Sequence, residues 1–158
     1  MESPSVLFVC LGNICRSPTA EAVFKSRANN AGIDVYVDSA GTSGWHIGER
    51  PDPRSIEAGE AAGYDFTGQA SRKVTRADFG DFDHIIAMDA QNLKDLSALC
   101  PPDLRGKLSL FLDFAPNAGV RDVPDPYYGG GDGFTRVLRL VEQASEGLLA
   151  YIAARGQG

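Results

Sequence analysis

The pattern of apolar residues changes near the amino end of the chain, from a continuous run to helical spacing. Val6–Cys10 is a continuous apolar run with β-branched and aromatic residues, which predicts a strand buried on both faces of a parallel sheet. Apolar residues then recur at helical spacing, and Ser17 followed by Pro18 predicts the N-cap and first position of a helix. Residues 10–16 are therefore expected to form a tight loop between this strand and this helix.

Strand and helix patterns alternate through the rest of the chain. Further strands are predicted at Ile33–Ser39, His84–Met88 and Lys107–Leu112. Helix starts are predicted at Asp52 with Pro53, at Thr75–Asp78, at Asp89, and from Phe134, where a long amphipathic helix closes the chain. Because a strand–helix–strand unit makes a right-handed crossover between parallel strands, the pattern predicts an α/β fold in one domain over residues 1–158.

The loop between the first strand and the first helix carries Cys10 and Arg16. Backbone N–H groups of such a loop, together with the positive end of the helix dipole, favour a tetrahedral oxyanion and also stabilise a cysteine thiolate. The planar guanidinium of Arg16 can hold two oxygens of one phosphoryl group. Gly12 and Asn13 suit unusual backbone angles, and Ser17 is placed both to cap the helix and to donate to the sulfur. The loop therefore predicts a phosphate site with its own nucleophile.

Net charge and cysteine content exclude several classes of partner and compartment. A formal net charge of −6 and a pI near 4.8 argue against nucleic acid or an anionic membrane as partner. No Asp or Glu occurs between Glu2 and Glu21, so the predicted phosphate site is locally positive. Three cysteines without a paired spacing pattern indicate a reducing compartment. The first residues show no signal peptide or membrane span, and a cytoplasmic location is expected.

The sequence Val9-Cys-Leu-Gly-Asn-Ile-Cys-Arg-Ser-Pro18 resembles the signature loop of the low-molecular-weight protein tyrosine phosphatases. The resemblance covers nearly the whole chain and implies a four-stranded parallel sheet, order 2-1-3-4, flanked by helices on both faces. It implies that Cys10 is the nucleophile, that Arg16 clamps the phosphate, and that Ser39 hydrogen-bonds to the loop asparagine. The other residues of the implied phosphate-binding loop are Leu11, Gly12, Asn13, Ile14, Cys15 and Ser17.

A phosphoryl transfer to sulfur needs an acid for the leaving group, and Asp122 and Asp125 both lie in the loop before the last helix. Residue chemistry leaves this choice open, because a loop aspartate is often only a turn former. The sequence Asp125-Pro-Tyr-Tyr128 resembles the family's Asp-Pro-Tyr-Tyr loop, which implies that Asp125 is the general acid. The same resemblance implies that Tyr127 and Tyr128 lie at the rim of the substrate pocket.

A glycine-rich segment after the second strand carries Trp45 and His46. The carboxyl ends of neighbouring parallel strands share one edge of a sheet, so Trp45 is expected to wall the pocket over Cys10. The resemblance implies that this aromatic residue lines a slot for a phenyl ring. His46, next to Trp45, is a candidate for a residue that affects which substrate is chosen. Gln69 stands where the family often has a histidine, so no role is transferred to it.

The resemblance implies hydrolysis of protein phosphotyrosine and small aryl phosphates through a cysteinyl-phosphate intermediate, with Asp125 acting first as acid and then as base. No metal or other cofactor is expected, because Arg16 and the helix dipole supply the positive charge. Cys15 is expected to trap oxidised Cys10 as a reversible disulfide. The expected partners are phosphotyrosine-containing proteins, and the protein is expected to be a monomer.

Three other functions remain open at the level of sequence. An arsenate reductase of the same fold relays electrons through additional cysteines in a later segment, and here only Cys100 lies outside the loop. A phosphoarginine phosphatase of the family carries threonine where Ile14 stands, so Ile14 and Trp45 favour an aryl phosphate. A phosphotyrosine-binding module without turnover would not need Asp125, and carriers of similar fold lack the loop arginine.

Overall fold

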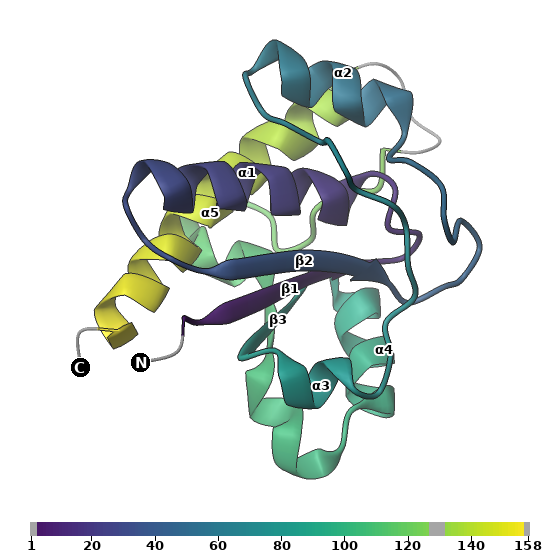
Figure 1. The fold of residues 1–158 in the computed structure, drawn as a ribbon, viewed down its shortest axis with the longest axis vertical. Coiled ribbons are helices and arrows are strands. Elements are labelled where there is room, and N and C mark those ends of the chain that lie inside the picture. Colours follow the sequence, from purple (N-terminus) through teal and green to yellow (C-terminus); the bar gives the residue numbers. More distant parts are fainter. Residues whose placement is uncertain (1–2, 127–131, 157–158) are drawn as a thin grey trace.

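Four parallel strands form one sheet in the order β2-β1-β3-β4 in the computed structural model, which describes residues 3–126 and 132–156 (Figure 1). The strands are β1 (Ser5–Cys10), β2 (Tyr36–Gly41), β3 (His84–Ala87) and β4 (Leu108–Leu110). All three neighbouring pairs are parallel. The predicted fold class and strand order are confirmed.

Helices cover both faces of the sheet (Figure 1). One face carries α1 (Arg16–Asn30), α2 (Pro53–Ala61) and α5 (Asp132–Gly156), and the other carries α3 (Asp78–Asp81) and α4 (Ala90–Leu99). Short 3-10 helices follow at η1 (Pro102–Lys107), η2 (Phe111–Phe114) and η3 (Pro116–Ala118). The layers are those of an α/β fold, with one sheet between two layers of helices.

Alternate residues of β1 enter the two hydrophobic cores on opposite faces of the sheet, as the two-residue period of a strand requires. Leu7 and Val9 pack on the α4 side, whereas Val6, Phe8 and Cys10 pack on the side of α1 and α5. The apolar stripe of α5 is buried in this second core, through Val137, Leu138, Val141, Ala144, Leu148 and Ile152. This period places the Cys10 side chain beneath the start of α1.

Strand limits depend on the neighbouring strand as well as on the apolar pattern. β2 begins at Tyr36 and not at the predicted Ile33, and it continues to Gly41. Its register explains the shift, because Tyr36 pairs with Ser5, the first residue of β1. The same reason shortens β4, which pairs with the four-residue β3 and ends at Leu110, before the end of the apolar run.

The start of α1 differs from its prediction in a way that matters for the site. The helix begins at Arg16 with Cys15 at the N-cap position, so the prediction that Ser17 is the N-cap is wrong. The Ser17 hydroxyl instead lies 3.0 Å from Cys10 Sγ. Cys15 makes no side-chain capping hydrogen bond in the described structure, which suits a helix end whose N–H groups bind an anion.

The starts of α2 and α4 follow their sequence signals, whereas α5 begins at Asp132, two residues before the predicted Phe134. The predicted caps Asp52 and Asp89 are confirmed, since their side chains accept from Arg54 N at 2.9 Å and Asn92 N at 2.7 Å. The start of α3 differs, because the helix begins at Asp78 with Ala77 at the N-cap position and Thr75 is not its cap, although the Asp78 carboxylate accepts from Thr75 N at 2.7 Å. These caps place α2 and α4 directly after the loops that surround the site.

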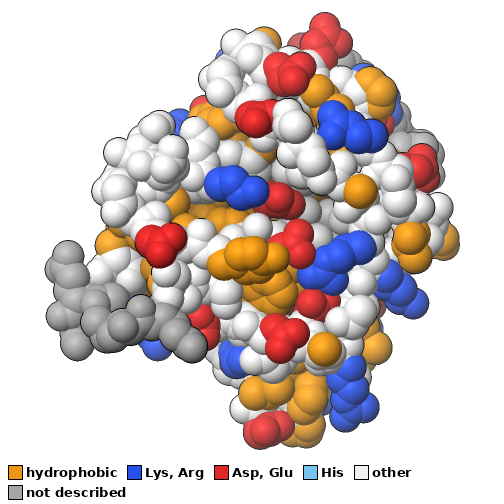
Figure 2. Space-filling model, in the orientation of Figure 1, with side chains coloured by type: hydrophobic (Ala, Val, Ile, Leu, Met, Phe, Trp, Pro, Cys, Tyr) orange, Lys and Arg blue, Asp and Glu red, His pale blue; other side chains and the backbone are white. Residues whose placement is uncertain are grey.

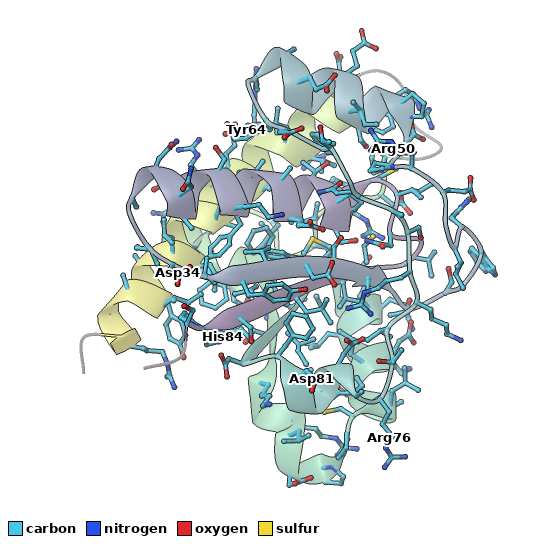
Figure 3. The ribbon with its side chains drawn as sticks, viewed as in Figure 1. Asp34, Arg50, Tyr64, Arg76, Asp81 and His84 are labelled. Carbon is cyan, nitrogen blue, oxygen red and sulfur yellow. The ribbon has the colours of Figure 1, made fainter. Side chains whose placement is uncertain are left out.

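Charges of both signs are interspersed on the surface, as the face drawn in Figure 2 shows. Ion pairs join separate elements: Arg27 of α1 lies 3.2 Å from Glu142 and 2.7 Å from Glu146, both in α5. Figure 3 labels Tyr64, after α2, whose hydroxyl also donates to Glu142 at 2.5 Å. Within the described ranges, no helix is long and apolar enough to cross a membrane.

Gly147 lets α5 pack closely against η2. A Cβ at this position would lie 1.8 Å from the carbonyl oxygen of Phe114, a backbone atom that cannot swing away. We therefore expect Gly147→Ala to lower the free energy of unfolding by about 1–3 kcal/mol, the usual cost of overpacking, in a urea titration. Gly80→Ala in α3 is the matched control, because a Cβ there meets open space. Equal unfolding midpoints for both variants would contradict this packing argument.

Candidate active site

The loop between β1 and α1 is held by its carbonyl oxygens. The carbonyls of Cys10, Leu11, Gly12 and Ile14 accept hydrogen bonds of 2.7–3.0 Å from groups outside the loop, namely the N–H groups of Thr42, Ser43 and Asp52 and the hydroxyl of Ser71. Peptide units whose oxygens are fixed outward direct their N–H groups to the opposite side. The loop therefore surrounds the position above Cys10 with backbone donors.

The Cys10 sulfur is the buried centre of this loop. Its residue is 2% exposed, and Sγ accepts from Asn13 N at 3.3 Å and lies 3.0 Å from Ser17 Oγ. Both contacts, together with the N-terminus of α1, favour a negative charge on the sulfur. The position suits a thiolate nucleophile.

Asn13 organises the loop from below. It is the only residue other than glycine with positive φ (56°) among the described residues, a conformation that asparagine tolerates. Its amide nitrogen donates to Ser17 Oγ at 2.8 Å and to Ser39 Oγ at 3.0 Å, and its amide oxygen accepts from Arg72 N at 3.0 Å. Because Ser17 Oγ accepts from Asn13, its own hydrogen can point to Cys10 Sγ.

A buried carboxylate ends this chain of hydrogen bonds. Ser39 Oγ donates to Glu21 Oε1 at 2.7 Å, and Lys25 Nζ lies 3.6 Å from the second oxygen of Glu21. Burial raises the pKa of Glu21, while its hydrogen bond from Ser39 acts in the opposite direction. The bonds run from Glu21 through Ser39, Asn13 and Ser17 to the Cys10 sulfur, so they fix the orientation of each side chain.

Arg16 is held in place by two segments distant in the sequence. Its side chain is 3% exposed, and Nη1 donates to Asp89 Oδ2 at 2.6 Å and to the carbonyl of Val123 at 3.0 Å. Nη2 lies 3.7 Å from Asp125 Oδ2. Burial by itself would lower the pKa of Arg16, but the charges of Cys10 and Asp89 outweigh it and raise that pKa. The guanidinium therefore stays charged beside the sulfur.

A pocket opens above the loop. Most of the predicted site residues line it: Cys10, Leu11, Gly12, Ile14, Cys15, Arg16, Trp45 and Asp125, with His46 in addition. Asn13 and Ser17 lie beneath the loop and support it. Trp45 borders the pocket as expected, although 74% of its surface is exposed. Tyr127 and Tyr128 lie outside the described residues.

Gly12 serves the pocket differently from the prediction. Its φ is not positive, so the expected unusual backbone angle is found only at Asn13. A Cβ on Gly12 would lie 3.0 Å from Cδ2 of His46, whose ring packs over the loop. His46 Nδ1 in turn contacts Glu49 Oε2 at 2.7 Å. The absence of a side chain at Gly12 therefore makes room for the imidazole.

Cys15 is a second buried thiol at the pocket, with a different environment from Cys10. Burial raises the pKa of Cys15 to about 12, a shift that a hydrogen bond with Ser55 opposes and the charge of Asp52 increases. Cys15 is therefore a protonated thiol at neutral pH. Cys10, Cys15 and Cys100 are all free and buried.

Gln69 and His84 take structural positions. Gln69 Nε2 donates to the carbonyl of Pro18 at 3.0 Å, in the first turn of α1. His84, labelled in Figure 3, lies at the amino end of β3, whereas the pocket lies beyond the carboxyl ends of the strands. Burial lowers the pKa of His84, and its ring contacts Tyr151 edge-on. Among residues 3–126 and 132–156, no group of three or more His, Cys, Asp or Glu could hold a metal ion.

Asp89 is the site residue that sequence reasoning missed. It was predicted only as the cap of α4, yet it also holds Arg16 through its second carboxylate oxygen. A signal was present, because Asp89 closely follows β3, and β3 lies next to β1. Residues after neighbouring parallel strands meet at one edge of the sheet, as Asp89 and Arg16 do.

Comparisons with known proteins show the family to which this chain belongs. The family model described as low molecular weight phosphotyrosine protein phosphatase matches residues 5–157. A low molecular weight phosphotyrosine protein phosphatase of Schizosaccharomyces pombe is 44% identical over 151 residues, which cover 94% of this chain and 96% of that protein. A low molecular weight protein-tyrosine-phosphatase of Streptomyces coelicolor is 46% identical over 158 residues, covering 97% and 96%.

Solved structures give the same result. The crystal structure of a protein tyrosine phosphatase from Entamoeba histolytica superposes with a TM-score of 0.93 at 42% identity, covering 99% of this chain and all of the other. That of YfkJ from Bacillus subtilis superposes with a TM-score of 0.91 at 41% identity, covering 98% of each chain. The chain therefore belongs to the low molecular weight phosphotyrosine protein phosphatase family, and it is a protein tyrosine phosphatase.

Proposed function

We propose that this chain hydrolyses phosphotyrosine in proteins, and small aryl phosphates, through a cysteinyl-phosphate intermediate. The observation that carries the proposal is the convergence of three groups on one pocket: the Cys10 sulfur at its floor, the Arg16 guanidinium beside it and the Asp125 carboxyl at its wall. They supply a nucleophile, a positive clamp and an acid, which is what transfer of a phosphoryl group to sulfur requires.

In the first step, the Cys10 thiolate attacks phosphorus in line with the leaving oxygen. The S–P bond forms as the bond from phosphorus to the phenolic oxygen breaks, and the proton of Asp125 passes to that oxygen. Arg16 and the loop N–H groups hold the remaining phosphoryl oxygens while charge develops on them. Tyrosine leaves, and Cys10 carries the phosphoryl group.

In the second step, water replaces the sulfur. Asp125, now a carboxylate, takes a proton from a water molecule as the water oxygen bonds to phosphorus and the S–P bond breaks. Inorganic phosphate departs and Cys10 is again a thiolate. This acid and base assistance is worth about 10²–10⁴ in rate.

The pocket favours an aryl group next to the phosphate. Ile14 and Trp45 line it, so a phenyl ring can contact an aliphatic side chain and an indole. Exposure of Trp45 at the rim suits a tyrosine presented on a protein surface. The proposed partners are therefore phosphotyrosine-containing proteins, which the enzyme meets as a monomer. Because the nucleophile must stay reduced, we place it in the cytoplasm.

Cys15 as a redox partner of Cys10 stays a prediction. Peroxide would oxidise the Cys10 thiolate to a sulfenic acid, and the Cys15 sulfur would displace water to give a disulfide. Because burial raises the pKa of Cys15, its protonated thiol reacts slowly with peroxide, and Cys10 is the cysteine that we expect to be oxidised first.

The test is phosphate release from matched phosphotyrosine, phosphoserine and phosphoarginine peptides, using reduced protein without added metal. We expect turnover of the phosphotyrosine peptide to exceed that of the other two by at least about tenfold, since only it offers a flat ring to Ile14 and Trp45. Preference for phosphoarginine would overturn the substrate assignment and leave the Cys10 mechanism standing. Binding of phosphopeptide without any turnover would instead indicate a binding module.

A further inference from the structure

Asp122 and Asp125 are the two aspartates of the acid loop, which we define as residues 120–126. Of the two, Asp122 does not line the pocket, and its Oδ1 accepts a hydrogen bond from Ala90 N at 3.0 Å. Ala90 is the first residue of α4, and the preceding residue, Asp89, holds Arg16 at 2.6 Å. The start of α4 is therefore joined to Arg16 through Asp89 and to the acid loop through Asp122.

Val123 anchors the same loop from the other side. Its N–H donates to the carbonyl of Met88 at 2.8 Å, directly after β3, and its carbonyl accepts from Arg16 Nη1 at 3.0 Å. The Val123 side chain is fully buried in the core on the α1 side of the sheet. Together, Asp122 and Val123 attach the loop to the junction of β3 and α4.

The connection from this attachment to Asp125 is stiff. Asp125 lies between Pro124 and Pro126, each of which has a fixed φ. A residue before proline is restricted to extended conformations, which limits Val123 and Asp125 as well. Pro126 is buried, and a Cβ added to Gly133 of α5 would lie 3.3 Å from Pro126 Cβ. The stiff segment therefore couples the position of the Asp125 carboxyl to the attachment that Asp122 and Val123 form together.

We propose that Asp122 is a positioning residue for the reaction, and that its hydrogen bond to the start of α4 keeps the Asp125 carboxyl at the leaving-group side of the pocket. The inference rests on the proposed role of Asp125 as general acid. Loss of this one exposed hydrogen bond should leave the Asp125 carboxyl out of place in most molecules. We therefore expect kcat/KM for substrates with poor leaving groups to fall by about fivefold to tenfold.

The experiment measures kcat/KM for a series of aryl phosphates whose phenols span a range of acidity. Asp125→Ala should lower kcat/KM by about 10²–10⁴ for poor leaving groups and by less for acidic phenols, which steepens the dependence on leaving-group acidity. Asp122→Ala should lower kcat/KM by about fivefold to tenfold for poor leaving groups. The slope of kcat/KM against leaving-group acidity should lie between those of the wild type and of Asp125→Ala. The double variant should be no slower than Asp125→Ala alone.

Two further variants separate positioning from a general effect on structure. Asp122→Asn keeps an acceptor oxygen for Ala90 N, so it should restore the wild-type slope. Arg121→Ala is the matched control, because Arg121 directly precedes Asp122 in the chain and makes an exposed ion pair with Asp113 at 3.2 Å. Its loss should leave the slope unchanged. The inhibition constant of inorganic phosphate should be the same in the Asp122 variants and the wild type, because the phosphate cradle is intact.

The outcomes distinguish the inference from the function on which it rests. An unchanged slope in Asp122→Ala, multiplied losses in the double variant, or a loss in Asp122→Asn equal to that in Asp122→Ala would overturn the positioning role. An unchanged slope in Asp125→Ala would overturn the general acid itself.

Discussion

Replacing Cys10 with serine is expected to lower kcat for aryl phosphates by at least about 10⁴-fold, because a serine hydroxyl is not ionised at neutral pH and is a weak nucleophile. The substitution changes one buried atom, and the donors from Asn13 and Ser17 remain around it. The phosphate cradle is therefore preserved. Phosphate release under saturating substrate measures the loss, and calorimetric titration with inorganic phosphate should still detect binding.

Cys100→Ser is the matched control for Cys10→Ser. It makes the same change of thiol to hydroxyl at another buried cysteine, which lies at the end of α4 and does not line the pocket. We expect its kcat to stay within about twofold of the wild type. Activity of Cys10→Ser above about a tenth of the wild type would show that another group attacks phosphorus.

Exchanging Arg16 for lysine is expected to lower kcat/KM by about 10²–10³ although the positive charge is kept. The structure uses both ends of the guanidinium: Nη1 contacts Asp89 and the Val123 carbonyl, while Nη2 faces Asp125 in the pocket. A single ammonium group cannot hold Asp89 and two phosphoryl oxygens at once. Steady-state kinetics on the phosphotyrosine peptide measures this effect.

Arg27→Lys controls for the substitution itself. Arg27 makes ion pairs with Glu142 and Glu146 at the surface, and it does not line the pocket. Its kcat/KM should be unchanged, while inhibition by inorganic phosphate should weaken only in Arg16→Lys. If Arg16→Lys kept wild-type kcat/KM, a point charge would be sufficient and the forked geometry would have no catalytic role.

Much of the site is local in sequence, which is why the pattern predicts it. The segment from Cys10 to Ser17 joins a buried strand to the first turn of a helix. The contacts among Cys10, Asn13 and Ser17 span three to seven residues of sequence. Backbone chemistry acts over that range, so the predicted loop between strand and helix is where the structure has it. The caps Asp52 and Asp89 were predictable for the same reason, since each binds an N–H two or three residues later.

The choice between Asp122 and Asp125 required the fold or a family resemblance. The two aspartates have the same chemistry three residues apart, and only the tertiary structure turns one to the start of α4 and the other to the pocket. Ser17 illustrates the opposite error, in which a strong local signal for an N-cap is overridden. Its hydroxyl is engaged with Cys10 and Asn13, and these two contacts fix its position beneath the loop.

The sequence by itself predicted the succession of strands and helices along the chain, the loop between β1 and α1, and the candidate nucleophile and phosphate clamp, because adjacent residues encode these features. Only the tertiary structure decided the limits of β2 and β4, the pairing of Arg16 with Asp89 and the place of each acid-loop aspartate. The hydrogen bonds from Arg16 to Asp89 and Val123 cross 73 and 107 residues of chain. Contacts of that span depend on strand order and register, which no local pattern contains.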